Sequence, residues 1–128
     1  MRRSDRGLID RGANGCIFGN NMRPVGTHRG TTHVHGLKNH TIRDLPLMQA
    51  GGVVPSNRGP IILILNQAAK LDDSLTILSP GQMEHYRWTI NEKSPLATGG
   101  ETPSMESPEG YRIPLTIKHG LPYVKLRP

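Results

Sequence analysis

Short runs of alternating or β-branched apolar residues recur along the chain and are separated by turn residues. The runs cover residues 31–35, 41–47, 60–65, 87–90, 111–117 and 121–126. Turn signals rich in Gly and Asn lie between them, at 36–39, 51–52, 56–59, 98–100 and 109–110. Alternation with a period of two is typical of strands that bury one face. The pattern therefore predicts an all-β fold.

One short helix is expected near 80–86. Ser79 is a good N-cap, and Pro80 suits the first helical position. From 91 to 108 the chain turns polar and rich in Pro, Gly, Ser and Thr, which predicts a loop. A small hairpin over 111–126 is expected to follow it.

A single aspartate follows the first aliphatic pair of the chain. Leu8 and Ile9 predict the end of a buried strand, and Gly12 and Gly15 predict the turn after it. Asp10 is then held by a rigid element and displayed on a loop that other backbones can approach closely. An aspartate that begins a turn commonly caps its own backbone, so this pattern alone fits a structural role as well as a chemical one.

The length of 128 residues allows one small domain. Sixteen Lys and Arg against ten Asp and Glu give a net charge of +6, which raises the question of a polyanionic partner. The charge is scattered along the sequence, however, and no helix or zinc-finger signature for reading DNA is present. Direct nucleic-acid recognition is therefore not expected.

Cysteine usage and hydropathy favour a soluble intracellular protein. Cys16 is the only cysteine and cannot form an internal disulfide, which favours a reducing compartment. Its neighbours Ile17 and Phe18 are apolar, so we expect a small buried hydrophobe rather than a nucleophile. The N-terminal residues do not resemble a signal peptide, and the longest apolar run, 61–65, is too short to span a membrane.

Three histidines lie close together in the sequence. His33 and His35 would share one face of a strand, and His40 follows five residues later. No cysteine or fourth ligand stands at a zinc-finger spacing, and no glycine-rich phosphate loop is present. We therefore expect neither a metal nor a cofactor, and interpret the histidines as part of a half-exposed strand.

Several segments together resemble one protein family. The pattern apolar-apolar-Asp-x-Gly-Ala at 8–13 resembles the active-site loop of aspartic proteases, and four later segments follow in the order of that family. They are VHGLKNHTIRDLPL at 34–47, GPIILIL at 59–65, TILSPGQMEHY at 76–86 and EGYRIPLTIKHGLPYVKLRP at 109–128. These resemble the flap, the inner strand, a Leu-Leu-Ser-x-x-Gln-Leu stretch with its short helix, and a hairpin leading toward an integrase. The chain thus resembles the retropepsin-like protease region of copia-type retrotransposon Gag-Pol polyproteins.

The resemblance implies a fold and a division of the chain. It implies a small closed acid-protease barrel over residues 1–90, truncated at its N-terminus because only nine residues precede Asp10. Residues 91–128 would be a connector and a β-hairpin extension leading toward a pre-integrase region. Expression in the cytoplasm or in element-derived particles would follow.

The resemblance also implies a catalytic site and a substrate. Asp10, Gly12 and Ala13 would form the catalytic loop, and a homodimer would supply one aspartate per subunit to activate water for peptide hydrolysis. The substrate would be an extended peptide of the polyprotein, covered by the flap turn. The residues of that turn are Gly36, Leu37, Lys38 and Asn39.

Arg11 departs from the family pattern, which has Ser or Thr at this position. In the family the hydroxyl bonds across the two-fold axis, whereas two arginines there would bring unpaired charge into a buried place. An arginine that swings outward to pair with a carboxylate, or one that keeps the catalytic pair ionised, would not favour catalysis either. We therefore expect impaired proteolysis. The alternatives are a non-catalytic fragment that binds peptides or the rest of the polyprotein, and a basic accessory piece that binds nucleic acid through its charge.

Overall fold

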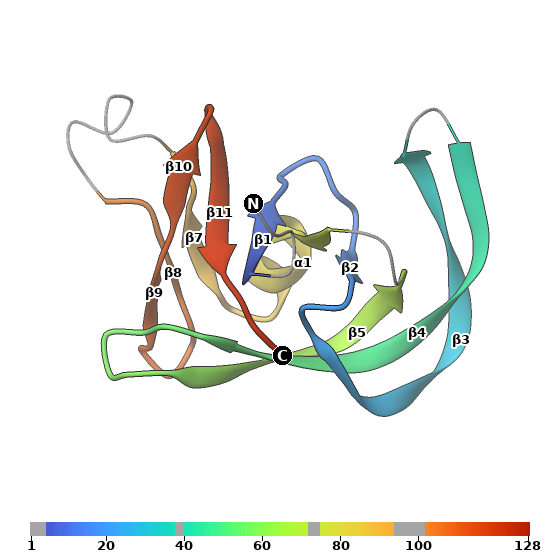
Figure 1. Cartoon of the computed structure of the whole chain (residues 1–128), viewed down its shortest axis with the longest axis horizontal. Helices are drawn as coiled ribbons and strands as arrows, with labels where there is room; N and C mark the ends of the chain where they lie inside the picture. The colour runs from blue at the N-terminus through green and yellow to red at the C-terminus, as the bar shows by residue number, and fades with distance from the viewer. Residues whose placement is uncertain (1–4, 38–39, 72–74, 94–101) are drawn as a thin grey trace.

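Eleven strands and one short helix make up the described part of the chain (Figure 1). The computed structural model describes residues 5–37, 40–71, 75–93 and 102–128, with the backbone alone over 27–37 and 40–44. The elements are β1 (Arg6–Ile9), β2 (Cys16–Phe18), β3 (Arg23–Leu37), β4 (His40–Val54), β5 (Ile61–Lys70), β6 (Thr76–Leu78), α1 (Pro80–His85), β7 (Thr89–Asn91), β8 (Ser104–Glu106), β9 (Arg112–Pro114), β10 (Thr116–Lys118) and β11 (Leu121–Lys125).

The strands form two sheets, so the prediction of an all-β fold is confirmed. Eight strands lie in the order β10-β11-β1-β6-β2-β5-β4-β3, and three more in the order β7-β8-β9. In the described residues β10 and β3 each pair with one neighbour and not with each other. The sheets therefore do not close into the barrel that the family resemblance implies.

Strand β1 lies inside the large sheet and has a hydrogen-bonded partner on each side. It runs antiparallel to β11 and parallel to β6, with Gly7 opposite Val124 and Ile9 opposite Leu78. Val124 and Leu78 are fully buried, and Ile9 is 3% exposed. The inner face of β1 thus anchors the strand in the main hydrophobic core through Ile9, while Leu8 lies half-buried on the other face.

The main core continues across residue 90. Met105 of β8 and Ile113 of β9 are fully buried and belong to the same cluster as Ile9 and Leu78. The final strand β11 pairs with β1 inside the large sheet. No break in the fold therefore coincides with residue 90 in the described residues, and the role of 91–128 as a connector stays a prediction.

Two turn predictions need correction. Gly51 and Gly52 lie inside β4 rather than in a turn. A Cβ atom on Gly52 would lie 2.6 Å from Cδ1 of Leu126, so glycine serves here to let the C-terminal residues approach the strand. The stretch 91–108, predicted as a loop, contains strand β8. The predicted turn at 98–100 lies outside the described residues.

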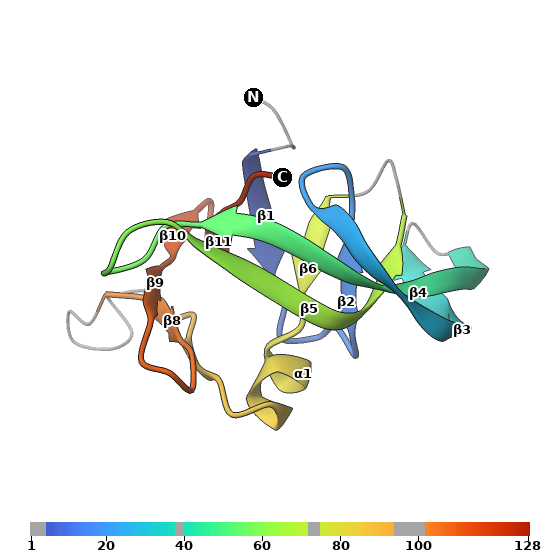
Figure 2. The ribbon, with the colours of Figure 1, turned by 90° about the horizontal axis from the view of Figure 1, so that it is seen from below.

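The helix prediction is confirmed. Helix α1 begins at Pro80, and the Ser79 side chain accepts a hydrogen bond from the Gln82 backbone N–H, as an N-cap should. Figure 2 shows α1 beyond the end toward which β1 runs, next to the loop that joins β1 to β2. Within the part of the chain that the structure describes, no helix has the length and apolar character needed to cross a membrane.

Truncating an isoleucine after residue 90 tests whether that segment shares the core. Ile113→Ala is expected to lower the free energy of unfolding by about 2–5 kcal/mol, because it leaves a cavity in a fully buried position. Ile62→Ala is the matched control, since Ile62 is 68% exposed and its truncation should change the free energy by about 0.5 kcal/mol or less. Urea denaturation measures both. Equal, small effects of the two variants would show that residues 102–128 do not contribute to the core.

Candidate active site

Asp10 begins a tight loop between β1 and β2, as expected from the sequence. Its backbone N–H donates to the Leu78 carbonyl at 3.0 Å, which extends the pairing of β1 with β6 by one residue. Its Oδ1 accepts the Gly12 N–H at 3.0 Å, and its carbonyl accepts the Ala13 N–H at 3.0 Å. The aspartate therefore does cap its own turn. Oδ2 of Asp10 accepts no hydrogen bond from the described residues.

A buried hydroxyl joins this loop to the start of α1. Ser79 has no solvent exposure, and its Oγ donates to the Ala13 carbonyl at 2.7 Å while accepting the Gln82 N–H at 3.2 Å. The Ser79 backbone N–H donates to Sγ of Cys16 at 3.3 Å. One side chain thus caps the helix and fixes the far side of the Asp10 turn.

The Gln82 amide forms a second bridge. Its Oε1 accepts the Cys16 N–H at 2.8 Å, and its Nε2 donates to the Gln67 carbonyl at 3.0 Å. Gln82 therefore ties α1 to the first residue of β2 and to β5. Together with Ser79, it holds the end of the loop that carries Asp10.

Cys16 is a buried core residue, as predicted. It is 4% exposed, and burial raises the pKa of its thiol to about 11. A thiol with so high a pKa is almost fully protonated at neutral pH and is a poor nucleophile. Cys16 therefore supports the loop by packing and is not a candidate nucleophile.

Arg11 points away from the loop and pairs with two carboxylates. Its Nε and Nη2 donate to Oε1 and Oε2 of Glu92, each at 2.9 Å, and its Nη1 pairs with Glu84 of α1. These hydrogen bonds raise the pKa of Arg11 further above its usual range, and the bond from Arg11 lowers the pKa of Glu92. The Arg11 side chain is 46% exposed, so in this chain its charge is neutralised at the surface and not buried.

The structure describes the predicted flap only in part. Gly36 and Leu37 are the last residues of β3, where Leu37 pairs with His40 of β4, while Lys38 and Asn39 lie outside the described residues. The free end of the β3–β4 hairpin stands apart from the loop between β1 and β2 in Figures 1 and 2. Asp10, Gly12 and Ala13 therefore lie together in one turn, as expected, whereas the β3–β4 hairpin does not lie next to that turn.

The described side chains contain no group of three or more His, Cys, Asp and Glu that could hold a metal ion. The histidines at 33, 35 and 40 fall where only the backbone is described. They therefore do not enter the candidate site.

Comparison with models of known protein families finds no match, and comparisons with curated proteins and with solved structures find no significant similarity. The site is therefore interpreted from its own residues.

Four residues around the loop were not predicted as parts of the site. Ser79 was identifiable as an N-cap, but its bond to Ala13 depends on tertiary structure. Gln82 lies in the segment TILSPGQMEHY, but nothing in that segment indicates which groups its amide would contact. Glu84 and Glu92 lie 73 and 81 residues from Arg11 in sequence, so no local pattern links them.

Removing the buried hydroxyl should weaken the fold. Ser79→Ala is expected to lower the free energy of unfolding by about 1–2 kcal/mol, because it removes an N-cap and leaves the Ala13 carbonyl without its donor. Ser56→Ala, in an exposed turn, is the comparison and should cost less. Chemical denaturation measures both, and a Ser79→Ala effect no larger than that of Ser56→Ala would contradict the bridging role of Ser79.

The Arg11–Glu92 ion pair should stabilise the folded chain only at pH values at which Glu92 is ionised. Because the pKa of Glu92 is lower in the folded chain than the ordinary 4.5, its contribution is present above that value and is lost as the pH falls through the folded pKa. Glu92→Gln should therefore lower the free energy of unfolding by about 0.5–1 kcal/mol at neutral pH and low salt, with the difference shrinking as the solution is acidified. Urea titrations across pH test this against Glu109→Gln, an exposed glutamate in a turn. A deficit of Glu92→Gln that stays constant with pH would argue against the ion pair.

Proposed function

We propose that this chain is a retropepsin-like aspartic endopeptidase domain of a copia-type retrotransposon polyprotein and acts as a homodimer. The observation that carries the proposal is the Asp10 turn. A half-buried carboxylate follows a central strand, and its loop is held by backbone bonds to β6 and by the Ser79 and Gln82 bridges. These contacts come from elements outside the loop, so they hold the Asp10 carboxylate in position even though the loop is short.

The order of elements supports the same family. A strand, an aspartate loop and a second strand precede a long hairpin, an inner strand, and a short strand that leads into a helix. This is the order in which the resembling segments occur in the sequence. We further propose that the chain adopts the closed retropepsin topology and that dimerisation completes the barrel.

The chemistry requires a second carboxylate. In the proposed mechanism two aspartates a few ångströms apart share one proton, because like charges that close do not both ionise. One carboxylate activates a water as general base, and the other polarises the scissile carbonyl. The motif occurs once in this chain, so two-fold symmetry supplies the partner's Asp10, and the small residues Gly12 and Ala13 let the two loops approach.

The proposed substrate is an extended peptide. Strand β3 is an edge of the large sheet in the described residues, and such an edge presents unpaired backbone groups along its length. A peptide can add to an edge of this kind through backbone hydrogen bonds, with side-chain pockets giving specificity. The flap turn at 36–39 would then close over the peptide.

Arg11 lowers the proposed activity. It lacks the hydroxyl that bonds across the two-fold axis, and its bonds to Glu84 and Glu92 draw its side chain toward α1 and the end of β7. Those carboxylates neutralise its charge within one subunit, which reduces repulsion between two copies. The missing hydroxyl bond is therefore the main defect in the proposed dimer.

Paired substitutions test the proposal. We expect Arg11→Ser to increase both dimerisation, measured by sedimentation velocity, and cleavage of an unfolded protein substrate at mildly acid pH. Adding Asp10→Asn should reduce that cleavage by about a hundredfold or more, because it removes the general base. Asn is a suitable control for folding, since its Oδ1 can still accept the Gly12 N–H.

Two outcomes would contradict the proposal. Cleavage that is unchanged by Asp10→Asn would show that another group, or a contaminating protease, performs the reaction. A dimer of the Arg11→Ser variant that cleaves nothing would favour the non-catalytic peptide-binding fragment instead.

A further inference from the structure

A second surface lies on the face of β1 and β11 that points away from the core. Gly7 and Val124 are opposite each other and buried, so the alternation of the strands places their neighbours on the other face. Arg6 lies directly opposite Lys125 there, and Leu8 lies opposite Tyr123. Two cations and an aromatic side chain therefore share one face of two adjacent strands.

Arg6 and Lys125 place like charges directly opposite each other on this face. Like charges directly opposite each other destabilise a pair of strands. Within the described residues neither Arg6 nor Lys125 forms an ion pair, although Asp5 immediately precedes Arg6. The Arg6 guanidinium instead stacks on the Tyr123 ring, 4.3 Å from its centroid, and its buried Nε has no acceptor. An anion bound between Arg6 and Lys125 would relieve this repulsion.

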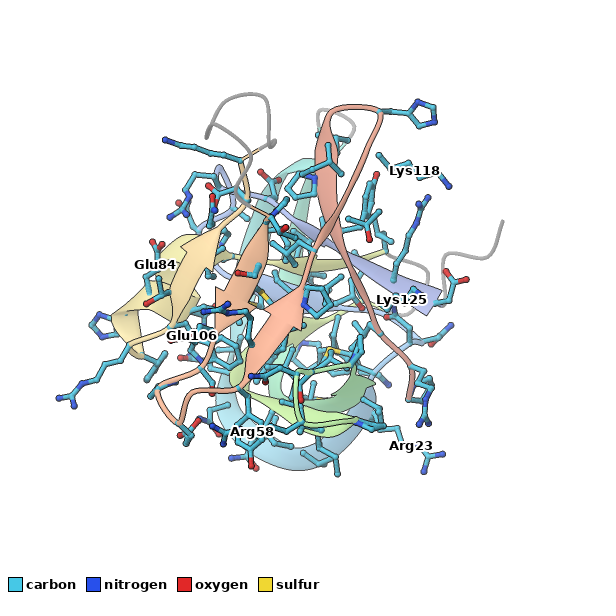
Figure 3. The ribbon with its side chains drawn as sticks, turned by 90° about the vertical axis from the view of Figure 1, so that its left-hand side faces the viewer. Arg23, Arg58, Glu84, Glu106, Lys118 and Lys125 are labelled. Atoms are coloured by element: carbon cyan, nitrogen blue, oxygen red, sulfur yellow. The ribbon has the colours of Figure 1, made fainter. Side chains whose placement is uncertain are left out.

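Strand β10 adds a third cation. Thr116 pairs with Tyr123 and Lys118 pairs with Leu121, so Lys118 stands on the same face as Tyr123 and Lys125. Figure 3 shows Lys118 and Lys125 on the same side of the β10–β11 hairpin. Lys125 is four residues along β11 from Leu121, a distance of about 13 Å at strand spacing. A single small anion does not reach both lysines, whereas a chain of anionic groups does.

The aromatic contact distinguishes between polyanions. The planar guanidinium of Arg6 over Tyr123, with the half-buried Leu8 beside it, offers a flat surface for stacking. Nucleic-acid bases stack on such surfaces whatever their sequence, while the carboxylates of an acidic peptide gain nothing from them. This feature favours a single strand with unstacked bases.

We propose that the cationic face, formed by Arg6, Lys118, Tyr123 and Lys125, binds single-stranded nucleic acid without preference for base sequence. Phosphates contact the three cations, and a base stacks on the Arg6–Tyr123 pair. The sequence contains no recognition motif, but the fold brings Arg6 close to Lys118 and Lys125, which lie 112 and 119 positions later in the chain. The face uses none of the residues of the Asp10 loop, so the proposal does not depend on proteolysis.

Binding is measured by fluorescence anisotropy with the full chain and a labelled oligothymidylate of about twelve nucleotides. The double variant Lys118→Gln/Lys125→Gln is expected to bind at least about fivefold more weakly at low salt. Its plot of log affinity against log salt should be shallower by about 1.4, because two phosphate contacts are lost. Tyr123→Leu should weaken binding by about fivefold or more through the loss of stacking.

A matched variant removes the same charge elsewhere. Arg23 and Lys93 are exposed and lie outside the cationic face, so Arg23→Gln/Lys93→Gln should leave affinity within about twofold. Circular dichroism verifies that each variant is folded; Tyr123→Phe, which keeps the ring, should bind like the natural chain.

Any of four results would overturn the proposal. They are undetectable binding at low salt, equal weakening by the matched variant, an unchanged affinity of Tyr123→Leu, and equal competition by polyglutamate. The second would indicate net charge alone, and the last two would indicate an anion site that does not read bases.

Discussion

The two-sided pairing of β1 is the constraint on which the rest of the structure depends. Its bonds to β6 continue one residue beyond the strand, through the Asp10 N–H and the Leu78 carbonyl, so the position of the aspartate is set by the sheet. Its pairing with β11 brings Lys125 opposite Arg6. Asp10 and the Arg6–Lys125 pair are therefore at opposite ends of a single strand of four residues.

Buried and exposed contacts contribute unequally to the candidate site. The Ser79 hydroxyl is inaccessible to water, so the loss of its two bonds would leave polar groups unsatisfied. The Arg11 pairs are partly exposed, and water and salt weaken them. The stability of the loop thus depends mainly on Ser79 and Gln82, while the carboxylates determine mainly where the Arg11 side chain lies.

Local signals predicted the local features of this fold, and long-range contacts determined the others. The Ser79 N-cap, the strand before Asp10 and the burial of Cys16 each follow from neighbouring residues. Gly52 looked like part of a turn because its role depends on Leu126, which is distant in sequence. The partners of Arg11 were unpredictable for the same reason. The barrel closure implied by the resemblance depends on contacts between strand edges, which sequence patterns do not encode.

The pairing of β1 with β11 has a consequence for biosynthesis. More than a hundred residues separate the two strands, as in the pair Arg6 and Lys125, so one edge of β1 stays unpaired until the ribosome has released β11. Contacts of such sequence separation form slowly, and an unpaired apolar edge invites association with other chains in the meantime. The nascent chain is therefore vulnerable to aggregation until β11 can pair with β1, and a chaperone that shields Leu8 and Ile9 would protect it during that interval.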